Sequence, residues 1–188
     1  MLLSALKRHD EAISELKRAV EIEPLNGSLY ANQALVYANA HRYSDALESV
    51  NAALTISGSD KSWNEILGML HIYQGMYEQG LEEIRSGAAE PPRIDYLLGL
   101  AYALGRAGRR REALQMINQL ERKPNADAVW VAIAWTGIRN KDKAFEWLNR
   151  ALDAHAPSEL WIGVFPCLDP LRSDPRFKEL LRRTGLPQ

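Results

Sequence analysis

Residues 8–24, RHDEAISELKRAVEIEP, decide the fold class of this chain. Apolar side chains recur at Ala12, Leu16 and Ala19, which is the i, i+4, i+7 spacing of one face of an α-helix. Charged residues fill most of the other positions, and Pro24 follows the last of them. The stretch therefore predicts an amphipathic helix over residues 10–22, whose small residues let a second helix approach closely.

The same pattern returns along the chain with a nearly constant period. The small residue at position 12 recurs after 34, 34, 33 and 31 residues, and a larger aliphatic residue follows it by four positions each time. A second column of small residues lies about a dozen positions upstream of each anchor, with a bulky residue three positions further on. The anchors are Ala12, Ala46, Gly80, Ala113 and Ala144, and the second column is Ala34, Gly68, Ala101 and Ala132. Two columns that keep step predict pairs of helices packed through small side chains.

These columns give the expected organisation of the chain. We expect a stub near 2–8 and helices near 10–22, 27–40, 43–56, 61–73, 76–87, 94–107, 109–121, 126–138 and 140–153. Breakers separate the pairs, among them Pro24 to Gly27, Ser57 to Asp60, Pro91-Pro92 and Lys123 to Asn125. No alternation typical of strands is present, so the predicted class is all-α. The predicted units are 1–26 (partial), 27–60, 61–93, 94–124 and 125–156.

The repeats resemble those of the tetratricopeptide (TPR) family, in which each repeat is a helix–turn–helix of about 34 residues. Residues 8–13 and 19–24 match the second half of such a repeat, and Leu67-Gly68 and Tyr37 match the first half. The resemblance implies a right-handed superhelix, or α-solenoid, with about four full helix pairs, a partial first repeat and a C-terminal capping helix. Departures are Gln33 and Asn64 at apolar positions, and Gly80 and Gly87 in place of alanine. The third unit should be the softest, since glycine costs about 1 kcal/mol relative to alanine within a helix.

The two ends of the chain differ in character. Met1 falls inside the first helix of a pair, so we expect either a piece of a longer protein or a stub that docks onto another subunit. Residues 157–188 read as a capping segment, with a last helix from Pro175 to about Arg183, a left-handed stop at Gly185, and Pro187 beyond it. The segment 168–177, LDPLRSDPRF, resembles the C-terminal TPR regions of bacterial multidomain regulators that carry cyclase-like, kinase or winged-helix domains.

Composition narrows the classes of partner. The 188 residues are 46% hydrophobic and 25% charged, with a net charge of −1, so neither nucleic acid nor an anionic membrane is expected to be bound directly. No apolar stretch reaches the ~18 residues of a membrane span. Cys167 is the only cysteine, which excludes an internal disulfide and fits the cytoplasm.

We find no chemistry-bearing motif in the sequence. No phosphate-binding glycine loop or nucleophile elbow occurs, and the four histidines are scattered, so we expect no catalytic residue, metal or cofactor. The sharpest charge cluster is Arg106, Arg109, Arg110 and Arg111. It is typical of a solvated turn, and the alternative is a site for an anionic partner.

The TPR resemblance implies that the first helices of successive units line a concave groove. By position, the groove residues would be Leu35, Asn39, Glu65, Met69, Tyr73, Leu98, Tyr102, Arg106, Val129, Trp130 and Ile133. The set is largely apolar and aromatic and contains no lysine, which suits a hydrophobic or helical segment better than a terminal carboxylate. In the alternative, residues such as Met69, Tyr73 and Trp130 pack between helices. If the groove is open, Tyr102→Ala with Trp130→Ala should abolish binding and leave the helices intact.

Two functions follow as hypotheses. The first is a non-catalytic module that binds a peptide or protein segment in the groove and forms part of a larger bacterial regulatory protein. The second is a domain that mediates self-association, for example a homodimer through the incomplete N-terminal repeat, or that docks against an attached effector domain.

Overall fold

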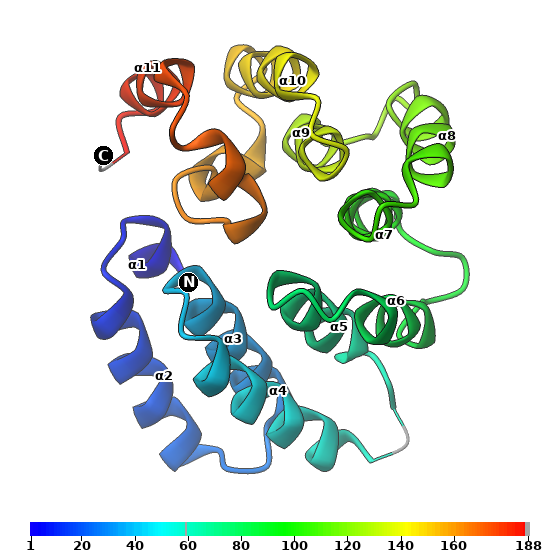
Figure 1. Cartoon of the computed structure of the whole chain (residues 1–188). Helices are drawn as coiled ribbons and strands as arrows, with labels where there is room; N and C mark the ends of the chain where they lie inside the picture. The colour runs from blue at the N-terminus through cyan, green and yellow to red at the C-terminus, as the bar shows by residue number, and fades with distance from the viewer. Residues whose placement is uncertain (59, 187–188) are drawn as a thin grey trace. The chain divides into compact units, whose positions relative to one another are not determined.

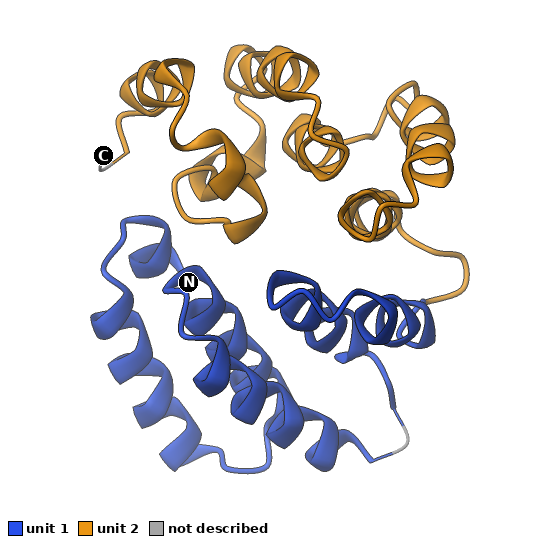
Figure 2. Cartoon of the chain, in the orientation of Figure 1, with its two compact units in different colours: residues 1–88 blue, residues 89–188 orange. Residues whose placement is uncertain are grey.

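The computed structural model describes residues 1–58 and 60–186, and these form helices and turns with no strand among them (Figure 1). The predicted all-α class of tandem helix pairs is confirmed, and the ends of the predicted helices lie within three residues of the observed ones. Ser59, in an expected breaker, and Pro187, expected beyond the stop of the last helix, lie outside the described residues. The chain divides into two compact units, Met1–Ala88 and Ala89–Gln188 (Figure 2).

Unit 1 contains the partial first pair and the next two pairs of helices. Within each pair the two helices are antiparallel neighbours, and α3 packs on both α2 and α4. The helices are α1 (Leu2–Ala5), α2 (His9–Ile22), α3 (Gly27–Asn39), α4 (Tyr43–Ser57), α5 (Asn64–Tyr73) and α6 (Tyr77–Ser86).

Unit 2 contains two further pairs, followed by a C-terminal segment of different character. α7 packs against both α8 and α9, and α11 packs against α10. Two short 3₁₀ helices, which the sequence periodicity does not reveal, precede the last helix. The elements are α7 (Ile94–Arg106), α8 (Arg110–Leu120), α9 (Ala128–Gly137), α10 (Lys141–Asp153), η1 (Pro157–Trp161), η2 (Pro166–Leu171) and α11 (Pro175–Thr184).

The turn that joins the two helices of a pair has the same backbone conformation in each repeat. His41 adopts φ 59° and Gly75 adopts φ 84°, both in the left-handed region. The amide of the next residue bonds back five positions: Arg42 N donates to Tyr37 O, and Met76 N donates to His71 O, each at 2.9 Å. This is a Schellman turn, which satisfies the free carbonyls at the end of the first helix. The equivalent left-handed residues in the other repeats are Lys7, Gly108 and Arg139.

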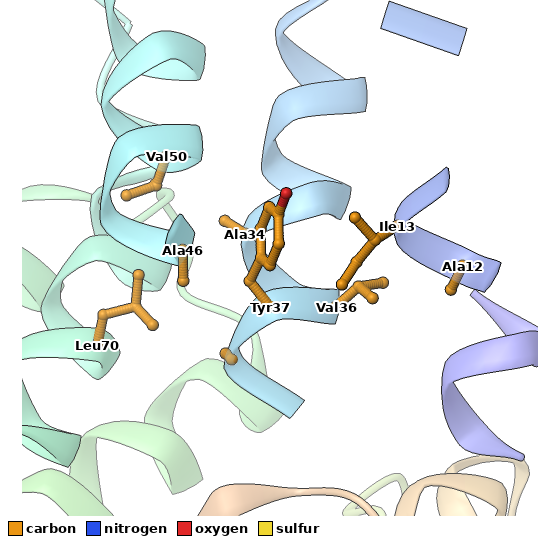
Figure 3. Packing of buried hydrophobic residues seen from close by; sticks show 9 residues of the cluster. Ala12, Ile13, Ala34, Val36, Tyr37, Ala46, Val50 and Leu70 are labelled. Carbon is orange, nitrogen blue, oxygen red and sulfur yellow. The ribbon is translucent and has the colours of Figure 1, made fainter. Parts of the chain in front are cut away.

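The small residues of both columns lie in the core. In unit 1, Ala34 and Ala46 are completely buried where α3 meets α4, and Val50 and Tyr37 pack beside them (Figure 3). In unit 2, Ala101, Ala113, Ala132 and Ala144 are likewise completely buried. The alanines let the paired backbones come close, and the larger side chains fill the space on either side.

In the third repeat the two columns carry glycine, and here the helices approach until the backbones touch. A Cβ added to Gly68 would lie 2.5 Å from the carbonyl oxygen of Gly80, and one added to Gly80 would lie 2.6 Å from that of Gly68. Neither position has room for a methyl group. Glycine is expected to weaken a helix. Here, glycine at both positions is what allows α5 and α6 to cross so closely.

The C-terminal helix covers α10, as expected of a cap. Asp174 accepts a hydrogen bond from Arg176 N at 3.0 Å at the start of α11, and Gly185 ends the helix with φ 68°. The Arg176 guanidinium lies 4.2 Å from the centre of the Phe145 ring, and Arg183 pairs with Asp153 at 2.6 Å. Among the helices in residues 1–58 and 60–186, none has the length and apolar character needed to cross a membrane.

The close crossing of α5 and α6 generates a prediction. Gly80→Ala should lower the free energy of unfolding by about 1–3 kcal/mol, because the new methyl group overlaps the Gly68 carbonyl. Gly99→Ala, within α7, is the control: its added Cβ would lie 3.9 Å from the nearest side-chain atom, so stability should rise by up to about 1 kcal/mol. Urea unfolding measures both. A stabilising Gly80→Ala would contradict the assigned contact.

Candidate functional site

The expected groove residues occupy aligned positions on the first helices of the pairs. Successive members of each column are separated by the repeat period, so they lie at the same level of α3, α5, α7 and α9. One column contains Leu35, Met69, Tyr102 and Ile133; a second contains Glu65, Leu98 and Val129; a third contains Asn39, Tyr73 and Arg106. The structure gives these equivalent positions different surroundings in the two units.

In unit 1 most of these side chains reach the surface. Leu35 on α3 is 37% exposed, and Glu65, Met69 and Tyr73 on the contacting helix α5 are half-buried. We call these four residues the α3/α5 surface. Tyr73 packs against Tyr43 with ring centres 5.9 Å apart, so one side of its ring is held by α4.

Asn39 does not belong to this surface, contrary to expectation. It is 7% exposed, and its Nδ2 donates to Ser4 Oγ at 3.3 Å. Ser4 in turn hydrogen-bonds to His9 Nδ1 at 3.1 Å. The short helix α1 therefore covers Asn39, and the asparagine links the partial first repeat to α3.

In unit 2 the expected groove is closed. Leu98, Tyr102, Val129 and Ile133 are completely buried, while Arg106 and Trp130 are partly exposed. The four buried residues cannot contact a partner in this state of the molecule. Their assignment to a groove is corrected: in this unit, the same repeat positions belong to the core.

The chain's own C-terminal segment packs on α9 and lies close to Tyr102 of α7. η2 packs directly against α9, and the orange segment in Figure 1 lies beside that helix. The Phe165 ring centre lies 5.8 Å from that of Trp130 and 6.1 Å from that of Trp161, with which it stacks. At the start of α9, Ser158 Oγ donates to Asp127, with oxygen–oxygen distances of 2.5 and 2.6 Å. Residues 157–171 thus pack on α9, one of the helices that were expected to line the groove.

The buried side of this segment is apolar, as in a protein core. Ile162, Leu168 and Leu171 are completely inaccessible to solvent, and Val164 and Cys167 are 2% exposed. Leu160, on the opposite side, is 41% exposed. We call residues 157–171 the C-terminal cover.

Tyr102 shows how deeply the cover buries the first helices of unit 2. Burial, with smaller effects from Cys167 and Asp169, raises the pKa of its phenol, and Arg106 Nη1 donates a hydrogen bond to its oxygen at 2.9 Å. The hydroxyl therefore stays neutral and acts in packing. The expectation that Tyr102→Ala leaves the fold intact is wrong, because truncating a buried aromatic residue typically costs about 3–5 kcal/mol.

The other candidate polar groups have structural partners. Arg109 forms two hydrogen bonds to Glu112, at 2.7 and 2.9 Å, and Arg110 donates to the backbone carbonyl of Ile138. His71, in the bulky column, hydrogen-bonds to Glu83. In the part of the chain that the structure describes, no group of three or more His, Cys, Asp or Glu side chains is placed to hold a metal ion.

Comparison with known proteins points to the same class of repeat. A family model described as tetratricopeptide repeat matches residues 1–24. The Hsp70-Hsp90 organizing protein of Triticum aestivum is 30% identical to this chain, over 46% of the chain and 18% of that protein. The chain thus corresponds to less than a fifth of that relative's length.

A solved structure, described as the crystal structure of YrrB, a TPR protein with an unusual peptide-binding site, aligns with 98% of this chain and 88% of its own. The TM-score is 0.49 and the identity is 17%, so this likeness supports no functional inference. The family match at residues 1–24 covers α1 and α2, and the same pairing of helices with its left-handed turn returns in the later repeats.

Proposed function

We propose that this chain is a non-catalytic interaction module that binds a peptide or protein segment on the α3/α5 surface. Its proposed setting is a larger bacterial regulatory protein in the cytoplasm. The resemblance of residues 168–177 to bacterial regulators supports the larger regulatory protein. The single, buried cysteine Cys167 supports the cytoplasm. The binding function draws on the TPR class of the repeats.

One observation supports the choice of surface above the others. At equivalent repeat positions, Leu35 is 37% exposed and Met69 is partly exposed, whereas Tyr102 and Ile133 are completely buried. Partly exposed aliphatic, thioether and aromatic side chains on adjacent helices offer a partner apolar contact area. The proposal therefore places the partner in unit 1.

Self-association is the alternative function, and the exposed residues of α1 favour it. Leu2, the first residue of α1, is 63% exposed, and Met1 just before it is 42% exposed. A second copy that covered them would bury apolar surface now in contact with water. Docking against an attached effector domain would use the same side chains.

Peptide selection on the full chain tests the proposed surface. Peptides chosen from a random library on immobilised protein are measured by fluorescence anisotropy against the wild type and a Leu35→Glu, Met69→Glu double variant. Two charges in an apolar contact should weaken binding by at least about tenfold. Ile22→Glu with Leu25→Glu is the control, because these residues are 79% and 82% exposed and do not belong to the α3/α5 surface.

Equal binding to both double variants would exclude the α3/α5 surface. Light scattering on the same samples separates the alternative: a dimer that becomes monomeric on Leu2→Lys would favour self-association.

The C-terminal cover generates a second prediction. Leu168→Ala should lower the free energy of unfolding by about 2–5 kcal/mol and speed amide exchange in α9, because Leu168 is fully buried in the cover. Leu160→Ala, at the 41% exposed leucine of the same segment, should change stability by less than about 0.5 kcal/mol. If both substitutions were equally harmless, the cover would not be part of the core of unit 2.

A further inference from the structure

A small basic pocket lies in unit 2, where the end of the C-terminal cover meets the first helices. Its volume is about 340 Å³, and it is formed by α7, the end of α9, the start of α10 and η2. The lining residues are Arg106, Thr136, Arg139, Lys141, Pro170 and Leu171. Three of the six are cations and none is acidic.

The two turns that bring these cations together are equivalent turns of successive repeats. Arg106 stands near the end of α7, and Arg139 is the left-handed residue between α9 and α10. Arg110 ties the turns to one another by donating to the carbonyl of Ile138. Lys141 follows as the first residue of α10, which Asn140 caps by accepting from Lys143 N at 3.2 Å. Repeat packing therefore fixes the positions of the cationic residues.

Two acidic residues that neighbour the lining residues in sequence form ion pairs with arginines of the C-terminal segment. Asp142 pairs with Arg176 at 2.7 Å, and Asp169 pairs with Arg172 at 2.5 Å. In residues 1–58 and 60–186, Arg139 and Lys141 have no carboxylate oxygen within 4 Å, and both are exposed. Hydrogen bonds from Arg176 lower the pKa of Asp174 to about 2, and Lys141 adds a smaller effect from further away.

We propose that this pocket binds glutamate side chains of an acidic peptide segment. Arg139 and Lys141 would donate to the carboxylate, and the exposed ring of Pro170 would contact the methylene groups. The volume corresponds to about ten water molecules, which is more than a single phosphate needs and suits a side chain with its flanking backbone. This surface is separate from the α3/α5 surface, so the inference does not depend on the proposed function.

The test uses the full chain and a labelled acetyl-hexaglutamate amide, with hexaglutamine amide as the uncharged probe. Fluorescence anisotropy should show binding of hexaglutamate only, weakening as salt is raised. Arg139→Gln with Lys141→Gln should reduce the affinity by at least about tenfold, and Arg139→Lys with Lys141→Arg should restore most of it. Circular dichroism should show unchanged helix content in these variants, because both side chains are exposed.

The matched control removes the same charge from another turn of unit 2. Arg122→Gln with Lys123→Gln, between α8 and α9, should leave the affinity unchanged. Equal loss in the two double variants would overturn the proposal, because it would show attraction to overall charge alone. Absence of hexaglutamate binding, or displacement of the peptide by inorganic phosphate at matched ionic strength and similar concentration, would also overturn it.

Discussion

Each helix pair depends on one residue held in the left-handed conformation between its two helices. The φ angles at Lys7, His41, Gly75, Gly108 and Arg139 lie between 59° and 84°, and each following amide bonds back to the carbonyl five positions earlier. Because the turn is short, it restricts the direction in which the second helix can leave the first. The backbone geometry of the turn therefore contributes to the direction of the second helix in each pair.

The small-residue columns then determine how close the paired helices lie. Alanine gives van der Waals contact at the crossing of α3 with α4, and glycine gives backbone contact at the crossing of α5 with α6. On the first helix of each pair, the positions that face away from this crossing can contact other parts of the chain or a partner. In unit 1 they form the α3/α5 surface, and in unit 2 the C-terminal cover takes them into the core.

Periodicity made the helices and the packing columns predictable from sequence, because each repeat imposes the same demands on the same positions. Periodicity could not predict the burial of four expected groove residues, because residues outside the repeats contact the helices that carry them. The four are Leu98, Tyr102, Val129 and Ile133. The 3₁₀ turns of residues 157–171 have no helical period, and their Pro and Asp residues read as loop. The sequence did contain one signal, the largely apolar run from Leu160 to Phe165. Such a run is expected to pack against the helices of the repeats.

Asn39 was also expected in the groove, and its burial likewise depends on a contact that repeat periodicity does not reveal. Its burial rests on Ser4, thirty-five positions away on a helix of one turn. The basic pocket likewise joins Arg106 to Arg139 and Lys141 across a full repeat, and its wall comes from the cover. The arginine cluster at 106–111 marked one side of that pocket, while the remaining cations stood alone in the sequence.

The role of the left-handed turn residue can be measured directly by exchanging residue types between equivalent turns. Urea unfolding of the full chain should show that His41→Gly raises the free energy of unfolding by up to about 1 kcal/mol, because glycine adopts this φ without steric cost. Gly75→Ala should lower it by about 1–2 kcal/mol, because a Cβ is strained at φ 84° although no atom lies within 4 Å of it. Substitutions that left the stability unchanged, or shifted it in the same direction, would contradict a turn-determined repeat.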